Sequence, residues 1–294
     1  MAKFTKEEIM EVLKPLSLIG SELLDVDIPS KWEAPDDYTL ERIEVDDIPI
    51  ERLIPKRIGS DLVIFQLHGG AYTIKYMDVY RDCALRYSKA AGGAEVISLD
   101  YDCAPSHIFP CALEETVKIY QWMLEQGIDA KKIVFVGDSA GGNLAMATTM
   151  YQRDNNQPMP KALITISPWV TLESNFASME RNKEKDLVLG VGMPVIHEQV
   201  LRPSYARGAD LKTPYLSPLY GEFHEFPPML IQFGNHEMLF DSIVEATEKI
   251  KEAGVDATVT IYDGMFHDFQ LLVPMLDESE AAWNEIAGFF QKIK

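Results

Sequence analysis

The chain has 294 residues, of which 47% are hydrophobic and 25% are charged, a composition typical of a globular protein in water. Acidic residues outnumber basic residues by 46 to 27, which gives a formal charge of −19. A surface of that sign repels phosphate groups, so nucleic acid and anionic membranes are excluded as expected partners.

The first residues and the cysteines indicate the cellular compartment of the protein. Residues 1–8 are polar and charged, and no apolar stretch approaches the ~20 residues that a membrane span needs. The cysteines, Cys83, Cys103 and Cys111, are odd in number and lack metal-ligand spacing, so we expect free thiols in a reducing compartment. The sequence therefore predicts a cytoplasmic protein with no metal and no cofactor.

The N-terminal third begins with a helix and a hairpin. Residues 5–8 (Thr-Lys-Glu-Glu) form a capping box, and apolar residues follow at helical spacing. Two strands are expected at Thr39–Val45 and Glu51–Ile58, joined by a turn at residues 46–49. Pro55 lacks an N–H donor, which predicts that the second strand lies near a sheet edge.

From residue 62 onward, apolar strands alternate with helices. The predicted strands are Leu62–Leu67, Ala94–Leu99, Ile133–Val136, Ala162–Ile166, Met229–Phe233 and Ala257–Tyr262. The predicted helices are Tyr80–Ala91, Cys111–Gln126, a helix that ends near Tyr151, Ser242–Ala253 and Glu278–Lys292. Continuous apolar strands in this alternation predict an α/β protein with a mostly parallel central sheet and helices on both faces. Ligands of such sheets bind beyond the carboxyl ends of the strands.

The long connection after Ile166 interrupts this alternation. Some sixty residues separate it from the next strand, which is too long for a simple crossover, and Gly192-Met193-Pro194 predicts a short helix within it. We therefore divide the chain into an N-terminal cap segment (1–38), a core (39–171 and 214–294) and a cap insertion (172–213). The insertion and the N-terminal helix could together form a lid.

Residues 137–141 carry the pattern G-x-S-x-G between a predicted strand and a predicted helix. A serine at such a turn is held in strained geometry with its hydroxyl exposed, so Ser139 is a candidate nucleophile. Gly137 and Gly141 are expected where strand and helix nearly touch, and a Cβ atom there would collide. The same five residues could also be a glycine-rich turn without chemistry.

The segment His68-Gly69-Gly70-Ala71-Tyr72 directly follows a predicted strand. Adjacent glycines let a loop present backbone N–H groups to a developing oxyanion. We therefore expect an oxyanion hole formed by Gly69, Gly70 and Ala140, with Ala71 as a further candidate.

A base and an acid are needed to activate the serine. His267 follows the last predicted strand, on the sheet edge expected for Ser139, and is the best placed of the six histidines. Either Glu237 or Asp241, in the loop after residue 233, could orient its imidazole. The order serine, acid, histidine is that of α/β-hydrolases. Three further aspartates, Asp138, Asp263 and Asp268, adjoin catalytic candidates and are expected to point elsewhere.

These segments together resemble the hormone-sensitive-lipase family of α/β-hydrolase esterases, from about Leu62 to the C-terminus. The matching motifs are H-G-G-A-Y at His68, Y-x-x-A-P…F-P at Tyr101, G-D-S-A-G-G-N at Gly137, G-x-x-[DE]-x-L-x-D at Gly234 and D-G-M-x-H at Asp263. The resemblance implies an α/β-hydrolase fold with a helical cap, and it places Glu237 at the acid position, with Asp241 at the start of the next helix. It also implies hydrolysis of small esters with short acyl chains, and it suggests a homodimer.

Three residues depart from the family pattern. Ala71 replaces the third glycine of H-G-G-G, which changes pocket shape but keeps an N–H donor. Asp102 replaces the arginine of Y-R-L-A-P and removes a salt bridge. Glu237 stands where aspartate is more frequent.

The leading hypothesis is a serine carboxylesterase that uses Ser139, Glu237 and His267. A deacetylase or amidase would use the same residues with a different leaving group. A binding protein on the same fold is the alternative from another class, and His267 argues against it, because binding members of the family lack that histidine.

Overall fold

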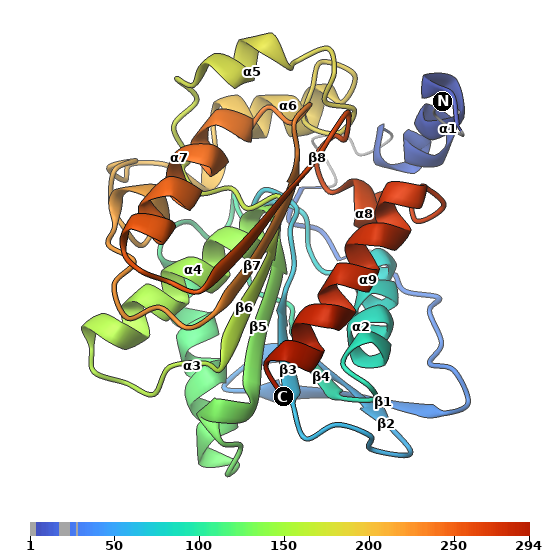
Figure 1. Ribbon diagram of the computed structural model, residues 1–294, viewed down its shortest axis with the longest axis vertical. Helices are drawn as coiled ribbons and strands as arrows, with labels where there is room; N and C mark the ends of the chain where they lie inside the picture. Colours follow the sequence, from blue (N-terminus) through green and yellow to red (C-terminus); the bar gives the residue numbers. More distant parts are fainter. Residues whose placement is uncertain (1–3, 18–23, 28) are drawn as a thin grey trace.

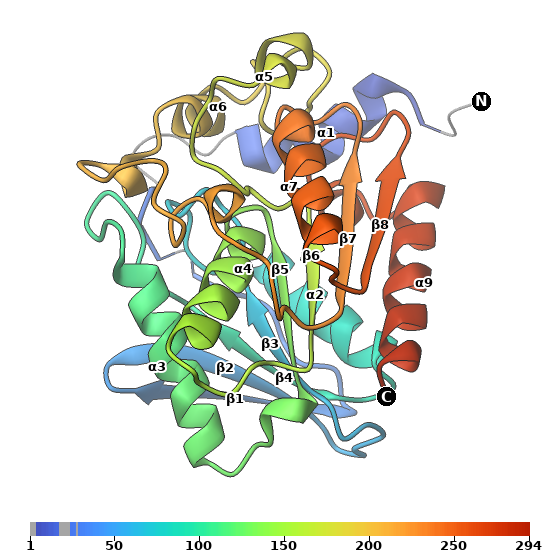
Figure 2. The same cartoon turned by 60° about the vertical axis from the view of Figure 1, so that its left-hand side comes forward.

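The computed structural model describes residues 4–17, 24–27 and 29–294. In this part of the chain one eight-stranded sheet has the order β1-β2-β4-β3-β5-β6-β7-β8 (Figures 1 and 2). The strands are β1 (Tyr38–Val45), β2 (Ile48–Pro55), β3 (Val63–Leu67), β4 (Glu95–Leu99), β5 (Ile133–Asp138), β6 (Ala162–Ile166), β7 (Met229–Gly234) and β8 (Ala257–Tyr262). β2 pairs antiparallel with β1 and β4, and the other pairs are parallel. The predicted mostly parallel sheet is confirmed.

Helices cover both faces of the sheet. The α-helices of the described residues are α1 (Lys6–Ser17), α2 (Asp78–Ala90), α3 (Cys111–Glu125), α4 (Ser139–Asp154), α5 (Ala177–Arg181), α6 (Pro194–Leu201), α7 (Phe240–Glu252), α8 (Phe269–Leu272) and α9 (Asp277–Lys292). Helices α3, α4 and α7 lie on one face and α2 and α9 on the other (Figure 1). Successive residues of the central strands, such as Phe135 and Val136, belong to two separate buried clusters. Both faces are apolar, which explains the unbroken apolar runs in the sequence.

The N-terminal hairpin differs in detail from the expectation. Asp46 and Asp47 alone form the turn, with φ values of 51° and 65°, so β2 starts at Ile48 and not at residue 51. Aspartate tolerates this left-handed backbone, which a two-residue hairpin turn requires. β2 lies near the sheet edge, as predicted from Pro55, but it is second from that edge, between the edge strand β1 and β4. Its register with β4 spans only Ile50–Leu53, so Pro55 lies beyond that pairing and removes no hydrogen bond from it.

Three helices lie at the carboxyl ends of the parallel strands. α1 begins with the predicted capping box: Thr5 N–H donates to the Glu8 carboxylate at 2.7 Å, and Glu8 N–H donates to Thr5 Oγ1 at 3.2 Å. α6 is the short helix predicted after residue 193, with proline in its first turn. α5 was not predicted. All three lie beyond the arrowheads of β7 and β8 (Figure 2). None of the described helices is long and apolar enough to cross a membrane.

Candidate active site

Ser139 lies at the junction of β5 and α4, with a φ of 50°. A non-glycine residue rarely adopts this backbone, so the position is strained. Close packing enforces the turn. A Cβ on Gly137 would lie 2.4 Å from the carbonyl oxygen of Gly141, and a Cβ on Gly141 would lie 2.0 Å from that of Leu67. The predicted steric role of both glycines is confirmed.

Glu237 and His267 come together from the loops after β7 and β8. Nδ1 of His267 lies 3.1 Å from Oε2 of Glu237, and both side chains are buried. The other carboxylate oxygen accepts hydrogen bonds from Gly234 N–H (2.6 Å) and Ser167 Oγ (2.8 Å). Burial raises the pKa of Glu237, while these three partners favour its ionised form.

Asp268 approaches the other side of the imidazole, contrary to the prediction that its side chain points elsewhere. Its Oδ2 lies 3.1 Å from Nε2 of His267, although the angle does not make a hydrogen bond. Asp268 has a φ of 52°, a left-handed backbone conformation that is rare for a non-glycine residue. Its other oxygen, Oδ1, is buried without a hydrogen-bond partner among the described residues.

The charges around His267 favour the imidazolium. Burial alone lowers its pKa, but the Asp268 and Glu237 carboxylates outweigh burial and hold the pKa well above 6.5. Asp186 and Asp138 also interact electrostatically with this histidine, since its charge lowers the pKa of each of them. His267 thus interacts electrostatically with four carboxyl groups, those of Glu237, Asp268, Asp186 and Asp138.

The loop after β3 lies directly beside the serine. Gly70, Ala71 and Tyr72 have φ values of 101°, 54° and 59°, so three successive residues take left-handed conformations. Asp138 is buried, its carboxyl packs against Gly69, and the Gly69 backbone stabilises the ionised form of that carboxyl. Burial and the Asp268 charge raise the pKa of Asp138 well above its usual value. Asp138 thus supports the loop, and the Gly69 amide is directed at it.

Two other titratable residues of the sequence motifs, His68 and Asp263, make structural contacts. Burial lowers the pKa of His68 to about 3, and its ring stacks on Tyr101 with centroids 4.1 Å apart, so it is a neutral packing residue. Asp263 accepts a hydrogen bond from Asn235 Nδ2 at 2.7 Å, as a structural residue would.

Asp241 faces α5 and not the histidine. Its carboxylate accepts hydrogen bonds from Ser178 N–H (2.8 Å) and from Arg181 (2.6 and 3.2 Å). Asp241 lies at the start of α7, as expected, but α7 begins one residue earlier with Leu239 at the N-cap, so an aspartate N-cap of this helix, which the position suggested, is not formed. Asp241 instead caps the first turn of α5, a helix that the sequence did not reveal.

An apolar cavity of about 50 Å³ opens beside Ser139 and His267. Gly70, Ala71 and Asp268 line it, as do apolar side chains of three other regions: Leu16 of α1, Ile74, Met77, Val79 and Tyr80 around the start of α2, and Val188, Leu189 and Ile196 between β6 and β7. Segments far apart in the sequence therefore enclose the same space.

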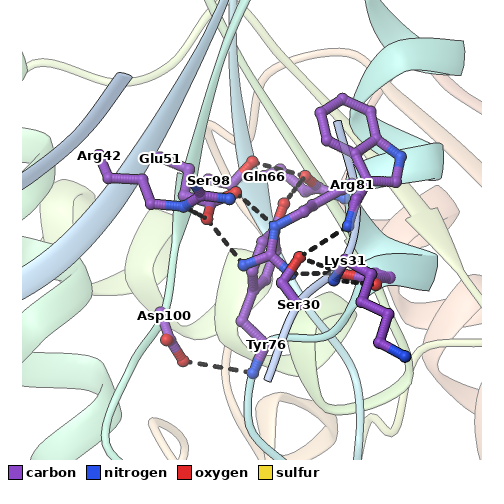
Figure 3. A network of polar contacts seen from close by, with 11 residues as sticks. Ser30, Lys31, Arg42, Glu51, Gln66, Tyr76, Arg81, Ser98 and Asp100 are labelled. Carbon is purple, nitrogen blue, oxygen red and sulfur yellow. Dashed lines mark hydrogen bonds and ion pairs between the residues drawn. The ribbon is translucent and has the colours of Figure 1, made fainter. Parts of the chain in front are cut away.

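A polar network fixes the start of α2, next to this cavity (Figure 3). Arg81 donates two hydrogen bonds to Glu51 of β2 (2.7 and 2.8 Å) and one to Asp78 (2.8 Å). Asp78 also accepts hydrogen bonds from Ser30 and from Lys31 N–H, which attaches the segment after α1 to α2. Charge-assisted, bidentate hydrogen bonds of this kind are strong and geometrically specific, so they anchor the start of α2 to β2.

Several supporting residues had no sequence signal. Ser167, with a φ of 45°, holds the Glu237 carboxylate and accepts the Asp268 N–H at 3.1 Å. Asp186 accepts Met238 N–H at 2.8 Å, and Asn182 donates to the Glu237 carbonyl at 2.7 Å. Their partners lie 52–101 residues away, so only a spatial arrangement reveals them.

The family model that describes the α/β-hydrolase fold matches residues 64–271 of this chain. The chain belongs to the α/β-hydrolase family. An acetyl-hydrolase of Streptomyces hygroscopicus is 34% identical over 227 residues, which cover 77% of this chain and 74% of that protein. An esterase of Acinetobacter venetianus is 32% identical over 241 residues, with coverages of 80% and 77%.

Solved structures agree with this assignment. The crystal structure of an esterase from the bacterial hormone-sensitive lipase family is 31% identical and superimposes with a TM-score of 0.83, covering 98% of this chain and 99% of that one. The resemblance found in the sequence motifs is confirmed. This hydrolase is therefore similar to enzymes that are named for ester cleavage.

Proposed function

We propose that this hydrolase is a serine carboxylesterase that cleaves small esters with short acyl chains. One observation carries the proposal: Ser139 and His267 line the same cavity. Ser139 has a strained backbone at the strand–helix turn, and Nδ1 of His267 lies 3.1 Å from the buried Glu237 carboxylate. The similarity to an esterase and an acetyl-hydrolase supports the same activity.

In the proposed reaction, His267 Nε2 takes the proton from Ser139 while the serine oxygen attacks the acyl carbon. Glu237 keeps the imidazole in the required tautomer and stabilises the imidazolium. Backbone amides stabilise the oxyanion, and the imidazolium gives its proton to the alcohol oxygen as the ester C–O bond breaks and the alcohol leaves. His267 then deprotonates a water molecule that attacks the acyl-enzyme, which releases the acid and restores the Ser139 hydroxyl.

The oxyanion donors proposed here differ in part from the sequence expectation. Gly70 and Ala71 line the cavity, whereas the Gly69 amide faces the Asp138 carboxyl. We therefore assign the role to Gly70, Ala71 and Ala140, and give Gly69 a supporting role.

The cavity supports a short acyl group. A volume of about 50 Å³ holds about three to five water-sized groups at ~10–15 Å³ each. Leu16 and Ile196 close it from the N-terminal segment (1–38) and the insertion (172–213), which we propose form the cap.

A series of p-nitrophenyl esters with increasing acyl length tests the proposal. We expect the highest kcat/KM at about C2–C6, because each methylene gains about 0.8 kcal/mol only while apolar room remains. A preference for long-chain emulsified triglycerides would contradict the short-acyl assignment. If p-nitroacetanilide, the amide with the same acyl group as p-nitrophenyl acetate, is cleaved faster than the ester, the enzyme is an amidase or deacetylase. No cleavage of any substrate would favour a binding protein.

A further inference from the structure

Three potential metal ligands, Asp102, Cys111 and Glu115, meet between the loop after β4 and the first turns of α3, and His107 lies beside Asp102. Glu115 Oε2 also accepts a hydrogen bond from Asp102 N–H at 2.8 Å, which holds the loop against α3. Asp102 and His107 lie in the loop, and Cys111 and Glu115 lie one helical turn apart on α3. One ligand atom from each of Asp102, Cys111 and Glu115 lies within 4.8 Å of the others. Nε2 of His107 lies 3.5 Å from Oδ2 of Asp102.

Two distances within this group lie within about 0.1 Å of the edges of a tetrahedral site. Zinc binds sulfur at about 2.3 Å and nitrogen or oxygen at about 2.0–2.2 Å, so neighbouring ligand atoms lie roughly 3.3–3.6 Å apart. The Cys111 Sγ–Glu115 Oε1 distance is 3.7 Å, and the His107–Asp102 distance is 3.5 Å. His107 is partly exposed, so its ring can rotate to close the remaining edges.

Charge also favours a cation here. The Asp102 and Glu115 carboxylates both lie near the Cys111 sulfur. Lys75, a cation of the neighbouring loop, is paired with Asp27 at 3.3 Å. A divalent ion bound to these ligands would deprotonate the thiol.

We propose that Asp102, His107, Cys111 and Glu115 form a binding site for a divalent transition-metal ion. One sulfur, one nitrogen and two carboxylate oxygens suit Zn²⁺ better than Mg²⁺ or Ca²⁺, which prefer oxygen ligands alone. The spacing D-x₄-H-x₃-C-x₃-E spans a loop and a helix, so it does not match the compact spacings that reveal zinc sites in sequences.

The site has a structural role, because the loop that holds Asp102 and His107 is hydrogen-bonded to the loop of residues 68–72, which contains the proposed oxyanion donors Gly70 and Ala71. Ala104 N–H donates to the Tyr72 carbonyl at 2.7 Å, and the Tyr101 hydroxyl donates to the His68 carbonyl at 2.8 Å. A metal ion between the loop and α3 would stabilise both loops without entering the hydrolytic reaction. The proposal is therefore independent of the proposed esterase function.

Cobalt binding to the untagged, chelator-treated full chain tests the proposal. We expect one Co²⁺ per chain, with a thiolate-to-metal charge-transfer band in the near ultraviolet that Zn²⁺ displaces, and a Zn²⁺-dependent rise in Tm. Cys111→Ser should abolish the band. Asp102→Asn and His107→Ala should weaken Zn²⁺ binding by at least ~10–100-fold, the loss that even an outer-shell change causes.

His224→Ala is the matched control, because His224 is also a partly exposed histidine beside a carboxylate, at 3.2 Å from Glu222. It should leave the band and the affinity unchanged. The absence of a charge-transfer band in the wild type, or an unchanged Zn²⁺ affinity in Cys111→Ser, would overturn the proposal. If Cys111→Ser does not fold, the His107→Ala variant, changed at a more exposed residue, decides: an unchanged Zn²⁺ affinity in that variant would also overturn the proposal.

Discussion

Replacing Asp268 by asparagine should change the pH dependence of the reaction. The base must be neutral to accept the serine proton, so kcat/KM rises with pH through the pKa of His267 in the free enzyme. In the wild type this pKa lies well above 6.5, because Asp268 and Glu237 outweigh the opposite effect of burial. Activity should therefore be low at pH 6 and increase above neutral pH.

The magnitude follows from the 3.1 Å separation of His267 Nε2 and Asp268 Oδ2. An opposite charge this close raises a pKa by about 1–3 units. Asp268→Asn removes that charge, so the apparent pKa of His267 should fall by about 1–3 units. The Glu237 carboxylate remains and continues to raise this pKa. Well below the pKa, each unit is a tenfold change in the neutral fraction, so kcat/KM at low pH should increase about 10–1000-fold.

The assay is kcat/KM for p-nitrophenyl acetate across pH 5–9. Asp263→Asn is the control, since this nearby aspartate bonds Asn235 and not the histidine. Its pH profile should match that of the wild type. An unchanged apparent pKa in Asp268→Asn would refute the argument that Asp268 holds the imidazolium.

Two further predictions concern the acid and the turn. Glu237→Gln should keep the fold and lower kcat by about 10⁴-fold, as the equivalent change does in a serine protease, whereas Asp241→Asn should keep a nearly normal kcat because its partners are Ser178 and Arg181. The reverse result would move the acid to Asp241. Gly141→Ala should destabilise the fold by at least about 1–3 kcal/mol, because its Cβ would lie 2.0 Å from a backbone oxygen. Gly288→Ala on α9 is the control, because a Cβ added there would meet no atom within 4 Å outside its own helix backbone. It should stabilise the fold by about 0.4–1 kcal/mol, and thermal melts of both variants measure the two effects.

Local patterns were sufficient to predict the core of the fold. Unbroken apolar strands, the capping box at Thr5 and the glycines at 137 and 141 each depend on neighbours close in sequence or on one steric contact. Their predicted elements agree with the structure to within a few residues. The hairpin turn was misjudged because Asp46 and Asp47 adopt left-handed backbones that propensity alone does not require.

The details of the site depend on contacts that no local pattern encodes. Loop position alone left both Glu237 and Asp241 as candidates, and only the family resemblance favoured Glu237; the structure directs Glu237 to His267 and Asp241 to α5. Asp268 reaches His267 Nε2 from a left-handed backbone that its sequence neighbours do not predict, and the role of Ser167 depends on partners 70 and 101 residues away. Such features require the assembled fold.

Covalent labelling tests the central claim, that Ser139 is the nucleophile, most directly. One equivalent of a serine-directed organophosphate should abolish ester hydrolysis, and peptide mass mapping should place the adduct on Ser139 alone. Ser139→Ala should take up no label and lose about 10⁴–10⁶-fold in kcat. An adduct on another residue, or near-normal hydrolysis by Ser139→Ala, would contradict the account.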